Sequence, residues 1–285
     1  MLLHVGTHKT ATTSLQSTLS SASAELLAHG TLYPEAGRVG LAHHNIAWGL
    51  VGDDRFEPGR GFLDELADEV RVLRPPLVFL SSEDFEYLGH SVDSLRVLRR
   101  WIRQLGYKPL VVVSLRDVAG YLESLYAELV RHGLIEDFDL FVRSALSARQ
   151  VVFRGWVFQL DYERLVASFA EVFGERSIVV IPFDGHDMVG RFLSYVPQIV
   201  PNGAGVGAMS GIPTDVFENV RMEDTELGQL LADNRLDARS PEDVCASQQR
   251  VQPPASFRLS EELRTHVSDT FGQQIERLVE RYSPS

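Results

Sequence analysis

The sequence predicts one α/β domain built as a three-layer sandwich, in which helices cover both faces of a central parallel sheet. Four short apolar runs alternate with patterns of helical spacing, and these runs lie at residues 2–6, 77–80, 110–115 and 177–183. A strand of a parallel sheet is buried on both faces, so its sequence is a continuous apolar run rather than an alternating one. No linker, internal repeat or low-complexity tract interrupts the 285 residues, and we expect a single domain over residues 1–285.

The amino-terminal segment predicts a strand, a loop and a helix, followed by an irregular stretch. Residues 2–6 (LLHVG) end at a glycine, and a polar turn follows. The apolar positions after that turn have helical spacing, and they are Leu15, Leu19, Leu26 and Leu27. Residues 31–62 are rich in Gly, Pro, His and Asp, so we expect a long surface excursion with a short helix near residues 46–50.

The middle of the chain continues the alternation of helix and strand. Apolar spacing predicts helices over residues 63–73, 91–105 and 118–133. Two prolines end the first of these helices, and the buried strand LVFL follows them. The strand LVVVSL precedes the third helix and leads directly into Arg116.

The carboxyl-terminal part predicts one more strand and a final helix. Residues 177–183 (SIVVIPF) form the strand, and residues 198–215, which are rich in glycine, form a loop. Ser260 is a good N-cap for the last helix, because its hydroxyl can accept from a free backbone N–H of the first turn. The apolar stripe of that helix is Leu263, Val267, Phe271, Ile275, Leu278 and Tyr282.

Charge and cysteine content restrict the partners of the protein. The net charge is −12, so a broad nucleic-acid-binding face is not expected, because neutralising phosphates needs a basic surface. The single cysteine, Cys245, excludes a disulfide framework and a cysteine-based zinc site within the chain. We find no signal peptide and no apolar run of membrane-spanning length, and we expect a cytoplasmic protein.

The segment between the first strand and its helix carries the clearest functional signal. It reads HVGTHKTATTS from His4 to Ser14. The backbone amides of Ala11 to Ser14 would point from a helix N-terminus toward an anion, and the helix dipole adds partial positive charge there. Lys9 supplies a cation, and further hydroxyl donors are Thr10, Thr12 and Thr13. These features predict a phosphate-binding loop, and the alternative is a simple capping cluster of Ser and Thr.

This loop differs from a Walker A motif, in which the lysine comes late and directly after a glycine. It resembles instead the 5′-phosphosulfate loop of the sulfotransferases that use 3′-phosphoadenosine-5′-phosphosulfate (PAPS), whose pattern is roughly Pro-Lys-[Ser/Thr]-Gly-Thr-Thr. His8 stands in place of the proline, and Ala11 in place of the glycine. The resemblance implies that Lys9 contacts the leaving oxygen, and that the fold is the P-loop-like sulfotransferase fold.

The same family binds the 3′-phosphate of PAPS through an arginine at the end of a later strand and a serine eight residues further on. Arg116 follows the strand LVVVSL directly, and Ser124 lies eight residues after it. A guanidinium can bind a phosphate through two hydrogen bonds, and a serine hydroxyl on the next helix can add a third. The alternative for Arg116 is a structural ion pair with Asp117 or with a carboxylate across the sheet.

Sulfuryl transfer also needs a base that accepts the proton of the acceptor group. Glu83 ends the strand LVFLSS, and the carboxyl ends of parallel strands face a ligand crevice. Some carbohydrate sulfotransferases use a glutamate as the base, and cytosolic sulfotransferases have a histidine in a similar place. His43 and His44 lie in the predicted excursion and are the second candidates. A structural role is the alternative for all three residues.

The resemblance implies PAPS as the donor and 3′-phosphoadenosine-5′-phosphate (PAP) as the product, with no metal ion. The acceptor is expected to be a hydroxyl or amine of a carbohydrate or small molecule, bound by residues 31–62 and 200–258. Two other functions remain open. One is a small kinase that uses ATP and Mg²⁺, with the strand before Glu83 as its Walker B strand, and the other is a non-catalytic module that binds PAP. The oligomeric state cannot be read from the sequence.

Overall fold

The computed structural model describes residues 1–8, 10, 12–183, 189–190, 192, 222–238 and 257–283. The chain folds into two compact units. The first unit comprises Met1–Arg116, Asp161–Glu218 and Gln273–Ser285. The second unit comprises Asp117–Leu160 and Asn219–Gly272. The predicted loop at residues 198–215 lies outside the described residues.

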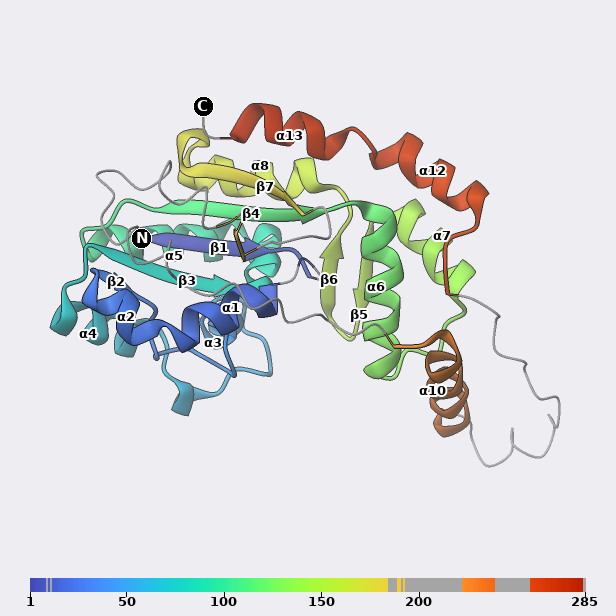
Figure 1. Cartoon of the computed structure of the whole chain (residues 1–285), viewed down its shortest axis with the longest axis horizontal. Coiled ribbons are helices and arrows are strands. Elements are labelled where there is room, and N and C mark those ends of the chain that lie inside the picture. Colours follow the sequence, from blue (N-terminus) through green and yellow to red (C-terminus); the bar gives the residue numbers. More distant parts are fainter. Residues whose placement is uncertain are drawn as a thin grey trace. The chain divides into compact units, whose positions relative to one another are not determined.

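A five-stranded sheet organises the first unit, with the strand order β2-β3-β1-β4-β7 (Figure 1). The strands are β1 (Leu2–Gly6), β2 (Thr31–Leu32), β3 (Leu77–Ser82), β4 (Leu110–Arg116) and β7 (Ile178–Phe183). All neighbouring pairs are parallel, so the carboxyl ends of the strands share one edge. The four strands predicted from apolar runs are confirmed, and the two-residue strand β2 was not predicted.

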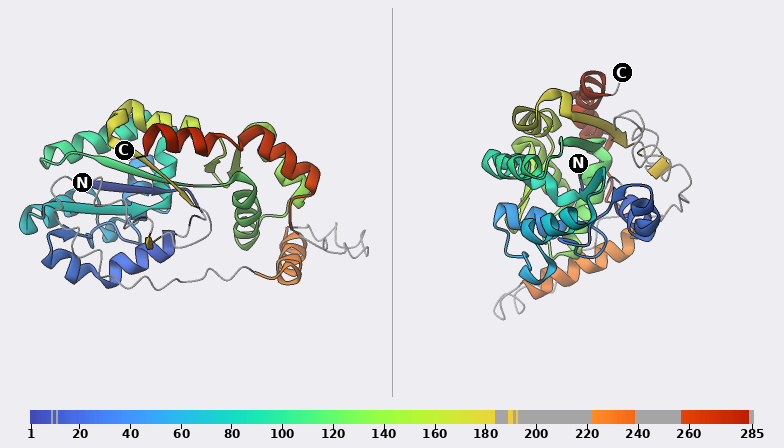
Figure 2. Two further views of the ribbon diagram at one scale, coloured as in Figure 1. Left: turned by 45° about the horizontal axis from the view of Figure 1, so that its top comes forward. Right: turned by 90° about the vertical axis from the view of Figure 1, so that its left-hand side faces the viewer.

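Helices lie on both faces of this sheet, which gives the predicted three layers (Figure 2). The α-helices of this unit include α1 (Thr12–Ser21), α2 (Ser23–Ala28), α3 (His44–Val51), α4 (Leu63–Leu73), α5 (Val92–Gln104), α8 (Tyr162–Phe173) and α13 (Gln274–Tyr282). Its 3₁₀ helices include η1 (Pro58–Arg60), η2 (Glu83–His90) and η3 (Glu175–Ser177). Of these, η2 begins directly where β3 ends.

The apolar side of α1 and α2 packs against one face of the sheet. Leu15, Leu19 and Leu26 are fully buried, as their spacing predicts, whereas Leu27 is half-buried. They share a core with residues of three adjacent strands, among them Leu2, Phe79 and Val112. Each fully buried leucine stabilises the fold by roughly 1.5–3 kcal/mol. This packing fixes α1 relative to β1, and therefore fixes the ends of the loop between them.

The second unit contains a helical group and a hairpin. Its elements include α6 (Val118–Arg131), α7 (Phe138–Ala148), α10 (Asp224–Asp237), α12 (Glu261–Phe271) and the antiparallel strands β5 (Gln150–Phe153) and β6 (Trp156–Gln159). The buried carboxylate of Glu123 on α6 accepts hydrogen bonds from Arg264 at 2.7 Å and from Arg258 at 3.0 Å. It also accepts from the backbone N–H of Leu259 at 3.0 Å, so α6 anchors the start of α12.

The predicted final helix is divided into two. Ser260 caps α12 as predicted, by accepting from the backbone N–H of Leu263. The helix ends at Phe271, and α13 begins at Gln274. A glycine at position 272 lowers helix propensity, and the buried side chain of Gln274 accepts a hydrogen bond from the backbone N–H of Tyr162 at 2.9 Å. The break coincides with the boundary between the two units.

Candidate functional site

Thr7 and Thr10, in the loop that follows β1, are held by hydrogen bonds to the backbone. The backbone N–H and the hydroxyl of Thr7 both donate to the carbonyl of Ser114 at 3.0 Å. The hydroxyl of Thr10 donates to the carbonyl of Thr7 at 2.7 Å. A Cβ at Gly6 would collide with the methyl group of Thr12, so only glycine fits at this position. The described residues of the turn predicted to bind phosphate are therefore closely packed at the carboxyl end of β1.

The predicted phosphate-loop residues fall partly outside the described residues, since Lys9 and Ala11 lie there. Of the others, Thr10, Thr12 and Ser14 are buried, and Thr13 is exposed. The helix α1 begins at Thr12, so its N-terminus follows the loop as predicted. The first turn of α1 contains no acidic residue, and the positive end of the helix dipole is therefore not neutralised by its own side chains.

Arg116, the predicted second anchor, is the last residue of β4, next to the strand that carries the loop. In the register of the sheet, Gly6 pairs with Ser114, two residues before Arg116. The guanidinium of Arg116 lies 5.6 Å from the ring centre of Phe183 on β7. The structure thus places the end of β4, where Arg116 lies, beside the start of the loop after β1.

Asp117 and Ser124, which follow Arg116 in the predicted motif, belong to the second unit. The carboxylate of Asp117 accepts from the backbone N–H of Gly120 at 2.7 Å and caps α6. Ser124 is half-buried on α6. Its predicted role as a hydroxyl donor to the 3′-phosphate stays a prediction.

Glu83, the first candidate base, is the first residue of η2, directly after β3. Because β3 and β4 flank β1 on opposite sides, Glu83 and Arg116 follow the two neighbours of the loop-bearing strand. The side-chain amide of Gln16 on α1 donates to Oε2 of Glu83 at 2.8 Å. The side chain of Glu83 is 19% exposed, so the carboxylate is held by the protein and still reaches the solvent.

His44, the second candidate, lies beside Glu83 at the start of α3. Its Nε2 is 4.0 Å from Oε1 of Glu83, and its Nδ1 is 3.1 Å from Oδ2 of Asp84. Burial alone lowers the pKa of His44, but the hydrogen bond to Asp84 and the charges of Glu83 and Asp84 outweigh it and raise that pKa. Protonated His44 is a cation, so in this state it cannot accept a proton.

His43, the third candidate, is fully buried and serves the fold. The backbone N–H of Ser81 donates to its Nδ1 at 3.1 Å, which leaves the proton on Nε2, 3.0 Å from the carbonyl of Pro34. Burial lowers the pKa of His43 to about 3. Because both nitrogens are hydrogen-bonded to the backbone in the core, we retain Glu83 and His44, and not His43, as candidates for acid–base chemistry.

Sequence reasoning missed a cluster of charged side chains centred on Asp84. Oδ1 of Asp84 is 3.2 Å from Nε2 of His8, and its Oδ2 accepts from the indole N–H of Trp48 at 2.6 Å. Nδ1 of His8 is 3.2 Å from Oε2 of Glu86. Arg55 approaches Oδ2 of Asp84 at 3.8 Å. The available signal was the acidic run SSEDFE at a strand end, of which only Glu83 was interpreted.

The cluster alternates carboxylates with protonated imidazoles. Burial alone lowers the pKa of His8, but its hydrogen bonds and charge interactions with Asp84 and Glu86 raise that pKa to about 10. Burial tends to raise the pKa of Asp84, yet the hydrogen bonds from His44 and His8 hold it well below its usual range. The order along the cluster is therefore Glu86, His8, Asp84, His44 and Glu83.

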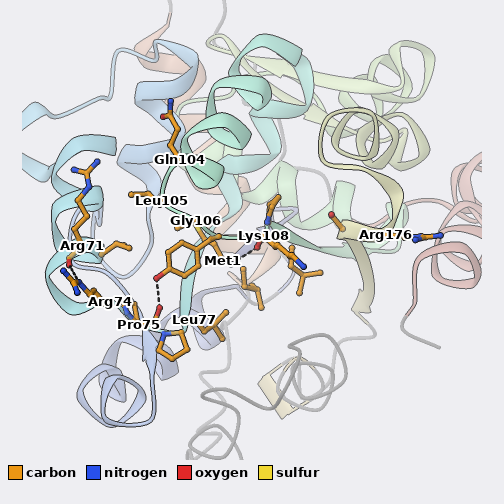
Figure 3. A pocket seen from close by; sticks show the side chains of 17 residues that line it. Met1, Arg71, Arg74, Pro75, Leu77, Gln104, Leu105, Gly106, Lys108 and Arg176 are labelled. Atoms are coloured by element: carbon orange, nitrogen blue, oxygen red, sulfur yellow. Dashed lines mark hydrogen bonds between the residues drawn. The ribbon is translucent and has the colours of Figure 1, made fainter.

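A cavity of about 1050 Å³ lies at the opposite edge of the sheet (Figure 3). Leu2, Leu77 and Leu110, which begin β1, β3 and β4, line it. Its charged lining residues are Arg71, Arg74, Lys108 and Arg176. Because the strands are parallel, this is the edge away from the phosphate loop. The cavity therefore does not belong to the candidate site.

The described part of the chain has neither a membrane-spanning helix nor a metal-binding cluster. No helix there is both long and apolar enough to span a membrane. Nor do those residues contain three or more His, Cys, Asp or Glu side chains arranged to hold a metal ion. The histidines and carboxylates around Asp84 instead form ion pairs with one another.

A solved structure of a sulfotransferase from Alicyclobacillus acidocaldarius is similar to this chain. The TM-score is 0.51 at 17% sequence identity, and the match covers 98% of this chain and 95% of that one. No family model and no curated protein matches the sequence. At this identity the similarity is one of fold, and it confirms the predicted class: an α/β fold with a central parallel sheet flanked by helices, like that of a sulfotransferase.

Proposed function

We propose that this protein is a sulfotransferase that transfers a sulfuryl group from PAPS to a hydroxyl or amine of a small-molecule or carbohydrate acceptor. One observation carries the proposal. Glu83, the phosphate loop and Arg116 follow three adjacent parallel strands, β3, β1 and β4, and so share one edge of the sheet. The reaction needs the same order, with a base, a site for the 5′-phosphosulfate and an anchor for the 3′-phosphate. The fold similarity to a sulfotransferase supports it.

In the proposed reaction the acceptor oxygen or nitrogen attacks sulfur in line with the leaving group. A bond forms between the acceptor atom and sulfur, and the bond between sulfur and the bridging oxygen breaks. The electron pair of the broken bond stays on the phosphate oxygen, which gives PAP, and the acceptor proton passes to the carboxylate of Glu83. A correctly positioned base typically contributes a factor of about 10²–10⁴ to the rate.

The donor is held, in this proposal, by backbone amides and a few cations. The N-terminus of α1 binds the 5′-phosphosulfate, and Lys9 stabilises the charge that develops on the leaving oxygen. Arg116 binds the 3′-phosphate through two hydrogen bonds, and Ser124 adds a hydroxyl. These interactions require no metal ion, which distinguishes the proposal from a kinase that binds ATP with Mg²⁺.

The acceptor is proposed to be small and not strongly anionic. The surface near the candidate base is formed by His44 and Glu83, with Asp84 and Glu86 buried behind them. The whole chain carries a net charge of −12. A polyanionic acceptor would be repelled by this charge, whereas a neutral hydroxyl or an amine would not.

The test is an assay with labelled PAPS, in EDTA, against a panel of sugars, phenols, alcohols and amines. We expect transfer of label to at least one acceptor, with PAP formed in equal amount. The matched pair is Glu83→Gln and Glu25→Gln, since Glu25 is an exposed residue of α2. Only the first substitution should abolish transfer. PAP binding without transfer would favour a binding module, and turnover of ATP that requires Mg²⁺ would favour a kinase.

A further inference from the structure

The carboxylate of Asp84 joins two segments that are far apart in the sequence. Its Oδ1 contacts Nε2 of His8 at 3.2 Å, and its Oδ2 contacts Nδ1 of His44 at 3.1 Å. His8 belongs to the loop after β1, and His44 begins α3. The side chain of Asp84 is only 5% exposed. Each oxygen therefore contacts a histidine, and Oδ2 also accepts a hydrogen bond from the indole N–H of Trp48 at 2.6 Å, so Asp84 itself is not exposed to a substrate.

The imidazole of His44 lies between the buried carboxylate of Asp84 and the carboxylate of the candidate base, Glu83. Its Nδ1 lies 3.1 Å from Oδ2 of Asp84 and 2.9 Å from the hydroxyl of Ser82, and its Nε2 lies 4.0 Å from Oε1 of Glu83. Carboxylates accept hydrogen bonds, so an imidazole that faces a carboxylate at each nitrogen interacts best when both nitrogens carry a proton and donate. The indole of Trp48 stacks on the imidazole at 5.6 Å between ring centres and further fixes the ring plane.

We propose that Asp84 is a positioning residue for sulfuryl transfer, which fixes protonated His44 beside the carboxylate of Glu83. The inference rests on the proposed function, because it takes Glu83 as the base. Protonated His44, whose Nε2 lies 4.0 Å from Oε1 of Glu83, orients the Glu83 carboxylate so that it can accept the proton of the acceptor. The charge of Asp84 balances that of His44, so the pair does this without adding net charge to the site.

The environment of His44 defines the expected pH dependence. The carboxylates of Glu83 and Asp84 face His44 from η2. His8, in the loop after β1, contacts the carboxylate of Asp84 from its other side. Arg55 also approaches Asp84, at 3.8 Å. The contacts with Glu83 and Asp84 favour protonated His44, and the positive charge of His8 opposes it. Removing the charge of Asp84 therefore releases the proton of His44 at lower pH.

The first experiment compares kcat against pH for the wild type and for Asp84→Asn, from about pH 5.5 to pH 9. We expect a new alkaline limb in the variant near the ordinary histidine pKa of about 6.5, with kcat falling roughly tenfold per pH unit above it. The wild type should keep its activity to higher pH. A purely structural role would lower kcat by the same factor at every pH, and that result would overturn the proposal.

Two further variants test the proposal even if Asp84→Asn folds poorly. His44→Gln keeps hydrogen-bonding groups but is never charged, so its kcat should be low with no alkaline limb. Asp93→Asn is the matched control, because Asp93 is 92% exposed and pairs with Arg96 on α5. Its pH profile should equal that of the wild type. Normal kcat in His44→Gln would also overturn the proposal.

A measurement that needs no acceptor separates this inference from the proposed function. In protein labelled with ¹⁵N-histidine, the ring signals of His44 are identified by their loss in His44→Gln. We expect both ring nitrogens of wild-type His44 to stay protonated above pH 6.5, the ordinary histidine pKa, and to lose a proton at lower pH in Asp84→Asn than in the wild type. Titration of the wild-type ring near pH 6.5 would refute the role of Asp84, whether or not the protein transfers sulfuryl groups.

Discussion

The side-chain amide of Gln16 donates a 2.8 Å hydrogen bond to Oε2 of Glu83, and so ties α1, the helix after the predicted phosphate loop, to the candidate base. The same amide is 3.4 Å from the hydroxyl of Ser81, which lies 2.9 Å from Nδ1 of His4. Nε2 of His4 is in turn 2.9 Å from the hydroxyl of Ser114. Glu83 is therefore the outer end of a buried network that crosses β3, β1 and β4.

Glu83→Gln tests the role of that carboxylate. The amide keeps the shape of the side chain but cannot accept a proton, so we expect kcat to fall by about 100-fold or more, with PAP affinity unchanged. Steady-state kinetics and calorimetry measure the two quantities. Turnover close to that of the wild type would remove Glu83 as the base.

Gly6→Ala tests the packing of the phosphate loop. The added methyl group collides with Thr12, so the loop must shift, at a cost of roughly 1–3 kcal/mol in the free energy of unfolding. We also expect PAP affinity to fall. Gly59→Ala is the matched control, because a Cβ there meets no atom within 4 Å. Equal stability of the two variants would show that the loop is not packed in this way.

Arg116→Ala tests the proposed 3′-phosphate anchor. A charged hydrogen-bonding contact is worth roughly 1.5–3 kcal/mol, so PAP should bind about 10- to 100-fold more weakly. The affinity for adenosine 5′-phosphate, which lacks the 3′-phosphate, should hardly change. Arg96→Ala, on the exposed side of α5, is the control. An unchanged PAP affinity in Arg116→Ala would place the 3′-phosphate elsewhere.

The buried histidines predict how stability depends on pH. Burial lowers the pKa of His4 and of His43 to about 3, so each binds a proton below about pH 6.5 in the unfolded chain but not in the folded one. Each should therefore reduce the free energy of unfolding by up to about 1.4 kcal/mol per pH unit as the pH falls from 6.5 toward 3. Denaturant unfolding between about pH 6.5 and pH 5 measures this slope.

His8 should change stability with pH in the opposite direction, because folding raises its pKa instead of lowering it. Its folded pKa is raised to about 10, so its stabilising contribution is complete below about pH 6.5 and is lost as the pH rises toward 10. Stability should therefore be greatest near pH 6.5. A stability that stays constant between pH 6.5 and pH 5 would contradict the neutral buried state of His4 and His43.

The main elements of the fold could be predicted because apolar pattern determines them. The continuous apolar run LVVVSL is enough by itself to predict a buried strand, and it lies in β4. The helix predicted at residues 63–73 has the observed bounds of α4. The hairpin of β5 and β6 could not be predicted, because its strands of four residues are only partly buried and lack a strong pattern. The division after Phe271 depends on tertiary packing around Gln274.

Residues of the candidate site could be predicted only where a charged side chain stands at the carboxyl end of a predicted strand. Glu83 and Arg116 were found in this way. The contact of His8 with Asp84 joins residues far apart in the sequence, and no local pattern reveals it. The difference between His43 and His44 likewise depends on which ring turns into the core, and adjacent residues on one segment give no sign of that.

The central claim is that the loop after β1 and the end of β4 form a binding site for a nucleotide with a 3′-phosphate. Calorimetric titration of the purified protein with PAP, in EDTA, tests it most directly, with adenosine 5′-phosphate and ATP as comparisons. We predict that PAP binds without a metal ion, and at least about tenfold more tightly than adenosine 5′-phosphate. No binding of PAP, or binding of ATP only when Mg²⁺ is restored, would contradict the proposed function.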